Sequence, residues 1–172
     1  MKHASINKNN MLDVKPLIAD EGQKFTLCLE QELSPNLIGN NPYKFLGFAK
    51  LDATAVYSDG AVNIEGSLIV PMEYICSRCG ANFKQNLFIE VCEKVLDGNS
   101  DGEHFEIRGD KIDVFEMINE LVASNIPNSV LCKEDCKGIC QICGKNKNEE
   151  DCECEISVGA NNPFGLLKDK IN

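Results

Sequence analysis

The sequence predicts an α+β fold in which mainly antiparallel strands form a curved sheet or partly open barrel beside one main helix. Three observations support this prediction. Stretches that alternate apolar and polar residues recur between residues 24 and 108, one later stretch has apolar residues at helical spacing, and cysteines crowd the C-terminal third. Alternation with period two is typical of half-buried strands, and spacings of three and four are typical of a helix with one buried face.

The chain divides into three expected parts. It has 172 residues, 43% of them hydrophobic, which is enough for one ordinary domain with a core of its own. Residues 1–23 lack clear periodicity and are predicted to form an irregular N-terminal arm or an edge segment. Residues 24–128 are predicted to form the β-rich domain, and residues 129–172 a cysteine-rich segment packed on it.

Five stretches are predicted to be strands. Apolar residues fall on one face of the first, and Asp59-Gly60 between the second and third favours a tight hairpin. The predicted strands are Lys24 to Leu33, Phe45 to Val56, Ala61 to Met72, Asn86 to Val95 and Glu103 to Arg108.

The main helix is predicted over residues 114–124. Asp113 is a good N-cap, and Glu116 three residues later completes a capping box. Asn125 and Pro127 end the helix. Its apolar face comprises Val114, Met117, Ile118, Leu121 and Val122, at the spacing expected of a helix that packs on the sheet. A second short helix is predicted over residues 163–170, anchored by Phe164, Leu167 and Ile171.

Eight of the ten cysteines occur in two patterns with metal-ligand spacing. One is Cys76-Ser77-Arg78-Cys79-Gly80, and the other is Cys132-x3-Cys136-x3-Cys140-x2-Cys143-Gly144-x7-Cys152-x-Cys154. A Cys-x-x-Cys turn aims two sulfurs at one ion, and the glycine that follows can adopt the left-handed conformation that closes it. The spacing therefore predicts tetrahedral sites for one or two zinc ions, built from thiolates.

The sequence leaves open how the eight cysteines are shared. The preferred partition places Cys140, Cys143, Cys152 and Cys154 in one site, because a short loop closes at little entropic cost. Cys76, Cys79, Cys132 and Cys136 would then form the other. The rival partition is a zinc ribbon made of Cys76, Cys79, Cys140 and Cys143, and a single four-cysteine site remains a third possibility.

These sites are expected to be structural, and the protein is not expected to be an enzyme. Catalytic zinc keeps a position open for water, whereas thiolates suffice here to fill every position. The two histidines, His3 and His104, are distant from the cysteine run, and His104 is expected at the surface. We expect Cys28 and Cys92, which lie inside strand patterns, to be small buried side chains. No phosphate-binding loop and no nucleophile with a histidine base is found.

Charge and hydropathy indicate the compartment and the partners. The formal net charge of −10 gives no global attraction to nucleic-acid phosphates, so any RNA contact must be local or made through a protein partner. No run of 18 apolar residues exists, and the first residues are polar, so we expect a cytoplasmic protein that neither crosses a membrane nor uses a small-molecule substrate. Cytosolic reductants keep thiols reduced, which favours metal over disulfides.

At these residues the chain resembles the YceD family of small bacterial and chloroplast proteins. The matching pieces are Cys76-Ser-Arg-Cys79, the run from Leu131 to Gly144, Cys152-Glu-Cys154, and the closing Asn162-Pro163-Phe164-Gly-Leu-Leu167. The family is associated with accumulation of large-subunit ribosomal RNA. The resemblance implies a non-enzymatic factor in ribosome assembly, with a precursor of the large ribosomal subunit as its partner. The alternative hypothesis is a redox- or zinc-responsive regulator, since thiolates are the oxidisable form of cysteine.

Overall fold

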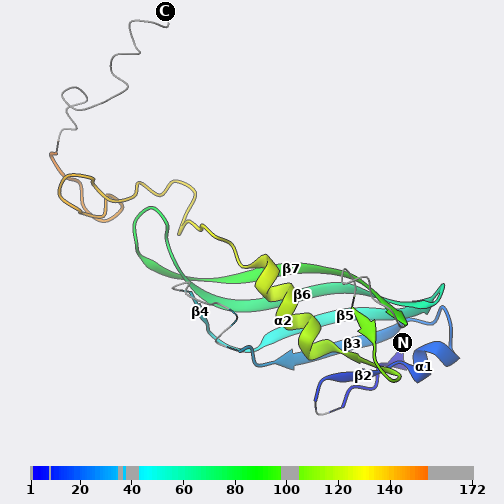
Figure 1. Cartoon of the computed structure of the whole chain (residues 1–172). Coiled ribbons are helices and arrows are strands. Elements are labelled where there is room, and N and C mark those ends of the chain that lie inside the picture. Colours follow the sequence, from blue (N-terminus) through cyan, green and yellow to red (C-terminus); the bar gives the residue numbers. More distant parts are fainter. Residues whose placement is uncertain (1, 8, 35–36, 38–42, 98–104, 155–172) are drawn as a thin grey trace, which may run out of the picture.

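A curled sheet shaped like half of a barrel makes up most of the molecule, and one main helix lies along it (Figure 1). The computed structural model describes residues 2–7, 9–34, 37, 43–97 and 105–154. Within these residues the sheet has nine strands. Their order across it is β1 (Lys2–His3), β3 (Phe25–Gln31), β5 (Ala49–Ser58), β6 (Ala61–Ile75), β7 (Asn82–Asp97), β8 (Glu106–Ile107), β9 (Lys111–Asp113) and β2 (Met11–Asp13), while β4 (Lys44–Phe45) also pairs with β6.

The centre of the sheet is an antiparallel meander of β3, β5, β6 and β7, as the alternating pattern predicted. The predicted hairpin joins β5 to β6, and its two turn residues, Asp59 and Gly60, have φ values of 51° and 74°. Two consecutive left-handed residues make the turn whose twist matches the strands on either side. β6 and β7 then pair along their whole length, from Ala61 opposite Leu96 to Ile75 opposite Asn82. This long hairpin extends past the other strands (Figure 1).

Gly66 allows β6 to approach β5 closely. A Cβ atom at this position would lie 2.3 Å from the backbone oxygen of Asp52 and 2.4 Å from the Cα of Ala53. Those separations are far inside van der Waals contact, so only glycine fits here.

The core lies between the sheet and α2 (Val114–Asn125). The predicted helix is confirmed to within one residue. The Asp113 side chain accepts a hydrogen bond from the Glu116 amide (2.9 Å), as its assignment as N-cap requires. Val114, Met117, Ile118 and Val122 are buried in one cluster with residues of the sheet that include Leu27, Ile64, Leu68, Val91 and Val95. Neither helix of the described residues is long and apolar enough to cross a membrane.

For residues 1–23 the sequence predicts an irregular arm or an edge segment, and the described residues among them fit the second alternative. They contain β1, β2 and helix α1 (Lys15–Ala19), and Leu12, Val14 and Leu17 are fully buried. β1 and β2 are the two ends of the sheet order, and the chain between them connects those ends. The Ala4 amide donates to the Thr26 carbonyl, and the Asp13 amide donates to the Ser5 carbonyl. Elements this short contain too few residues to display a period.

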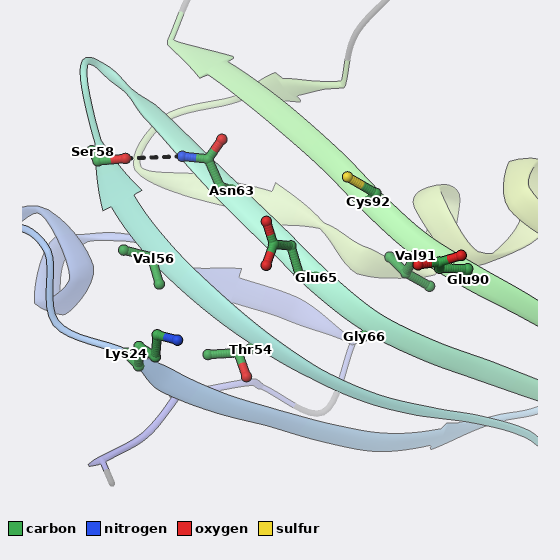
Figure 2. Close-up of a pocket in the computed structure, with 10 residues that line it drawn as sticks. All are labelled: Lys24, Thr54, Val56, Ser58, Asn63, Glu65, Gly66, Glu90, Val91 and Cys92. Carbon is green, nitrogen blue, oxygen red and sulfur yellow. Dashed lines mark hydrogen bonds between the residues drawn. The ribbon is translucent and has the colours of Figure 1, made fainter.

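Cys28 and Cys92 are exposed, which corrects the expectation that both are buried. Both lie on the outer face of the sheet. The Cys28 thiol donates to Asp52 (3.3 Å), and this hydrogen bond, with desolvation, raises the pKa of Cys28. Cys92 lies beside a polar groove of about 760 Å³ across β5, β6 and β7, with Glu65 and Glu90 among its lining side chains (Figure 2).

Several sequence-based predictions lie outside the described residues. They are the second helix over 163–170, the closing motif that begins at Asn162, and the surface position of His104. The strand predicted from Glu103 to Arg108 is partly described, and β8 occupies Glu106–Ile107 within it.

Candidate metal centres

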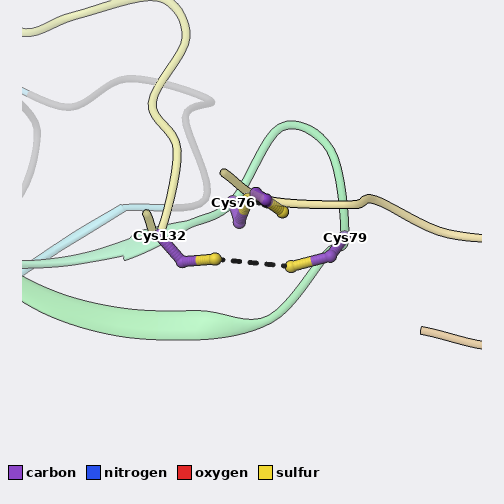
Figure 3. A group of neighbouring side chains, drawn as sticks. Cys76, Cys79 and Cys132 are labelled. Carbon is purple, nitrogen blue, oxygen red and sulfur yellow. Dashed lines mark hydrogen bonds between the residues drawn. The ribbon is translucent and has the colours of Figure 1, made fainter. Parts of the chain in front are cut away.

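The first Cys-x-x-Cys motif forms the tip of the long hairpin, between the end of β6 and the start of β7. The Cys76 amide donates to the Ala81 carbonyl, and the Gly80 amide donates back to the Cys76 carbonyl. The donor–acceptor distance is 2.9 Å in both bonds. Gly80 has a φ of 71°, the left-handed conformation expected for the residue that closes this turn. The turn brings the Cys76 and Cys79 side chains together (Figure 3).

The segment after α2 returns to this tip and is hydrogen-bonded to it. The Ser77 amide donates to the Val130 carbonyl (2.8 Å), and the Ile139 amide donates to the Arg78 carbonyl (3.2 Å). The Arg78 guanidinium also donates to the Cys136 carbonyl (3.2 Å). These bonds place two cysteines of the returning segment, Cys132 and Cys136, beside those of the hairpin tip.

The four sulfurs that meet there form the first cysteine group: Cys76, Cys79, Cys132 and Cys136. All four lie within 4.8 Å of one another. The Cys76–Cys136 and Cys79–Cys132 sulfur separations are both 3.7 Å, and the second contact is drawn in Figure 3.

A second cysteine group follows directly along the chain and comprises Cys140, Cys143, Cys152 and Cys154, again with all sulfurs within 4.8 Å. Its turn repeats the first. The Cys140 amide donates to the Lys145 carbonyl (2.8 Å), the Gly144 amide donates to the Cys140 carbonyl (2.9 Å), and Gly144 has a φ of 74°. The structure thus brings the eight cysteines together in the partition preferred from the sequence, and it does not form the rival ribbon.

The geometry of the first group fits a tetrahedral metal ion, and the sulfurs of the second group lie close enough together to share one. Four sulfurs at ~2.3 Å from one zinc ion are about 3.8 Å apart, close to the 3.7 Å separations found in the first group. The ten cysteines all lie in the described part of the chain, and all are free thiols. A set of four soft thiolate donors with no carboxylate or imidazole suits zinc or iron rather than a hard cation such as magnesium or calcium.

Backbone amides favour the thiolate at positions in both groups. Burial opposes ionisation of Cys76, but the backbone amides of Cys132, Cys79 and Arg78 outweigh it and lower its pKa to about 6. The amides of Cys143 and Ile142 likewise lower the pKa of Cys140 to about 6.

At other positions of each group the pKa of the cysteine thiol is raised. Burial, together with the neighbouring sulfurs of Cys76 and Cys79, raises the pKa of Cys132 to about 12. In the second group the Cys143 sulfur, with burial, raises the pKa of Cys154 to about 12. Four thiolates therefore repel one another at this distance, and a divalent cation among them removes the conflict.

The two groups differ in exposure. In the first, three of the four cysteines are buried and Cys132 is half-buried. In the second, Cys140 is buried, Cys143 is exposed, and Cys152 and Cys154 are half-buried. The second group is therefore the more accessible to solvent and to small reagents.

One polar contact to the first group was not predicted from the sequence. The Asn148 side-chain amide donates to the Cys136 sulfur at a distance of 3.4 Å. Asn148 belongs to the loop that joins Cys143 to Cys152 in the second group. No feature of an asparagine in a polar loop signals such a contact in advance, because it depends on how the loop folds back.

Comparisons with known proteins place the chain in a family. The family described as large ribosomal RNA subunit accumulation protein YceD matches residues 64–169, which include all eight clustered cysteines. The chain is also 33% identical, over 70 residues, to the Arabidopsis thaliana protein named large ribosomal RNA subunit accumulation protein YCED homolog 1, chloroplastic. That match covers 40% of this chain and 22% of the relative, so the match spans about a fifth of the relative's length. No solved structure matches. Because the family match extends over more than half of the sequence, the chain belongs to the YceD family.

Proposed function

We propose that this chain is a non-enzymatic zinc-binding factor that assists the accumulation of large-subunit ribosomal RNA. The role in accumulation of large-subunit ribosomal RNA is supported by the names of its family and of its relative. The observation that supports the zinc component is the convergence of four sulfurs at each of two places. In the first group, two sulfur pairs are separated by 3.7 Å, close to the edge of a zinc–thiolate tetrahedron.

The proposed role of zinc is to hold structure. A cage of four thiolates leaves no coordination position for water or substrate, so it has no means of activating either. Zinc bound in such a cage contributes on the order of 10 kcal/mol of apparent binding free energy, which becomes folding free energy. The segment that carries the second group needs such a source of order, because its large apolar side chains Ile139 and Ile142 are exposed.

The proposed partner is a precursor of the large ribosomal subunit. With a net charge of −10, the chain as a whole is repelled by RNA phosphates. We therefore expect contact through a protein component or through a small local RNA surface, presented by the zinc-held tip of the β6–β7 hairpin. Such assembly takes place where ribosomes are made, in line with the cytoplasmic location expected from the sequence.

Two measurements test this proposal. Protein purified without added zinc should contain two zinc ions per chain, one for each cysteine group. In a density gradient the protein should sediment with subunit precursors, and its deletion should lower the level of large-subunit ribosomal RNA. Protein found only at the top of the gradient, together with normal RNA levels after deletion, would end the proposed role.

A matched pair of variants links the metal to the role. C79S removes a ligand of the first cysteine group, whereas C92S removes an exposed thiol of the same hairpin that belongs to neither group. We expect C79S to lose sedimentation with precursors and C92S to retain it. If the two variants sedimented with precursors to the same extent, metal binding at the first group would not be needed for the proposed role.

The second candidate function is a redox-responsive regulator, and the exposure of the second cysteine group favours it. Hydrogen peroxide would oxidise two thiolates to a disulfide, be reduced to water, and release the zinc ion. Release of one ion per chain at low peroxide, reversed by thiol reductant and zinc, would support this function. Retention of both ions under those conditions would dismiss it.

A further inference from the structure

A hydrogen bond from the second cysteine group's loop to a sulfur of the first connects the two groups. Asn148 lies between Cys143 and Cys152, and its Nδ2 donates to the Cys136 sulfur at a distance of 3.4 Å. The Oδ1 of the same side chain accepts a hydrogen bond from the Lys137 amide at a distance of 2.9 Å. One side chain thus contacts both a sulfur of the first group and the backbone of the residue that follows it.

The loop holds Asn148 in this position through its own contacts. Asn146 Oδ1 accepts from the Asn148 amide (3.1 Å) and from Asn148 Nδ2 (2.7 Å). The amides of Glu149 and Glu150 both donate to the Asn146 carbonyl (3.0 Å), and Asn146 Nδ2 donates to Glu149 (2.7 Å). The loop therefore has a defined shape, and its two ends are cysteines of the second group.

The backbone between the groups is shared. The Lys147 amide of the loop donates to the Gly138 carbonyl at a distance of 2.9 Å, and Ile139 forms a β-bridge with Asn146. Ile139 in turn donates to Arg78 at the hairpin tip (3.2 Å). Gly138 fits tightly against that tip, since a Cβ here would lie 3.2 Å from the Arg78 carbonyl oxygen. The loop is therefore in direct contact with the segment that carries the first group.

We propose that the two cysteine groups form one coupled metal-binding unit, in which Asn148 is the positioning residue that strengthens metal binding at the first group when the second is filled. The inference rests on the proposed zinc-binding function. The loop's own contacts favour this position of Asn148, and an ion held by Cys143 and Cys152 would restrain both ends of the loop and so favour it further. Its N–H then faces the Cys136 thiolate, a charge-assisted contact that stabilises the metal-bound form of the ligand. Because coupling between two binding equilibria is reciprocal, filling the first group favours filling the second by the same factor.

The test uses the full chain and the variant N148D. Aspartate keeps an oxygen to accept from the Lys137 amide but replaces the N–H donor with an oxygen that faces the sulfur. Loss of an outer contact to a metal ligand reduces affinity by about 10–100-fold, so we expect that loss at the first group. Zinc competition with a chelator measures the affinity, and cadmium NMR, with one resonance for each site, identifies the site that has changed. K147A is the control, because its backbone contact does not need the side chain.

A double-mutant cycle separates coupling from a local structural effect. The second background carries C152S and C154S, so that the loop is no longer fixed at its C-terminal end. In that background N148D should reduce first-group affinity by a clearly smaller factor than it does in the unmodified chain. An equal loss in both backgrounds, or no loss in either, would overturn the inference while leaving the zinc sites in place. Absence of bound metal in the unmodified protein would instead refute the proposed function itself.

Discussion

Gly66 lies where β5 and β6 approach each other closely, and it provides a direct test of the curled sheet. The G66A variant adds a methyl group where backbone atoms of Asp52 and Ala53 lie within 2.4 Å. Backbone cannot move aside as a flexible side chain can. We therefore expect the free energy of unfolding to fall by about 1–3 kcal/mol or more, the usual effect of overpacking, as measured by chemical denaturation.

Gly47 is the matched control for this substitution. Its nearest neighbour to an added Cβ is the Pro71 side chain at 4.0 Å, which is an ordinary contact. The G47A variant should unfold with nearly unchanged free energy. An equal effect at both glycines would show that β5 and β6 are not in close approach at Gly66.

Individual positions show where reasoning from sequence succeeded and where it failed. The alternation that places Phe25 and Leu27 inside also places Cys28 outside, so its exposure was implied by the same pattern that predicted the strand. The expectation of burial came from the average behaviour of cysteine and overrode the local period. Asn148 is a different case, because its contact with Cys136 joins two loops whose relative position no local pattern contains.

Helix α2 begins at a cap that the sequence predicts and the structure confirms. The D113A variant removes the oxygen that accepts from the Glu116 amide. We expect a loss of about 1 kcal/mol in the free energy of unfolding, whereas D113N, which keeps an acceptor oxygen, should lose much less. Thermal unfolding followed by circular dichroism measures both. A destabilisation of D113N equal to that of D113A would contradict the assignment of the cap.

The strands were predicted well at their centres and poorly at their ends. β7 begins at Asn82 rather than at the predicted Asn86, because pairing with β6 continues through a polar stretch that carries no alternation. β1, β2 and β9 have only two or three residues each, which is too short for a period to be recognised. Such short strands form because they pair with neighbouring strands in the complete fold, and not because of a local sequence pattern.

The β6–β7 hairpin also makes a prediction about metal content. C79S removes one of four sulfurs at the hairpin tip, while the pairing of Ala61–Ile75 with Asn82–Asp97 continues along the body of the hairpin. The zinc content should fall from two ions per chain to one, with the strand signal in circular dichroism unchanged. C92S, on the same strand but in neither group, should keep both ions. Loss of the sheet in C79S would mean that the tip supports the whole hairpin.

Across the whole molecule, two kinds of interaction maintain structure. The sheet and α2 share one buried apolar cluster, whereas the cysteine segment has Ile139 and Ile142 exposed and only half-buried apolar neighbours such as Leu131. Exhaustive chelation should therefore make residues 131–154 sensitive to protease while the sheet and α2 remain resistant. Mass spectrometry of the fragments locates the cuts. Cleavage spread evenly over sheet and segment would refute this division.

The sequence was sufficient to identify the eight clustered cysteines but left their pairing open. The choice between the two partitions depends on where the segment after α2 meets the hairpin tip. That meeting is a property of the complete fold, since it involves hydrogen bonds from Ser77 and Arg78 to residues more than 50 positions away. Local spacing cannot encode it.

The first cysteine group joins Cys79 to Cys132, which are 53 residues apart. The chain between them contains β7, β8, β9 and α2, so a filled site encloses the main helix in a reversible crosslink. A covalent crosslink around a loop of this length lowers the entropy of the unfolded chain by an amount equivalent to about 4 kcal/mol. Loss of the ion would remove this contribution, so the stability of the folded chain would depend on the supply of zinc.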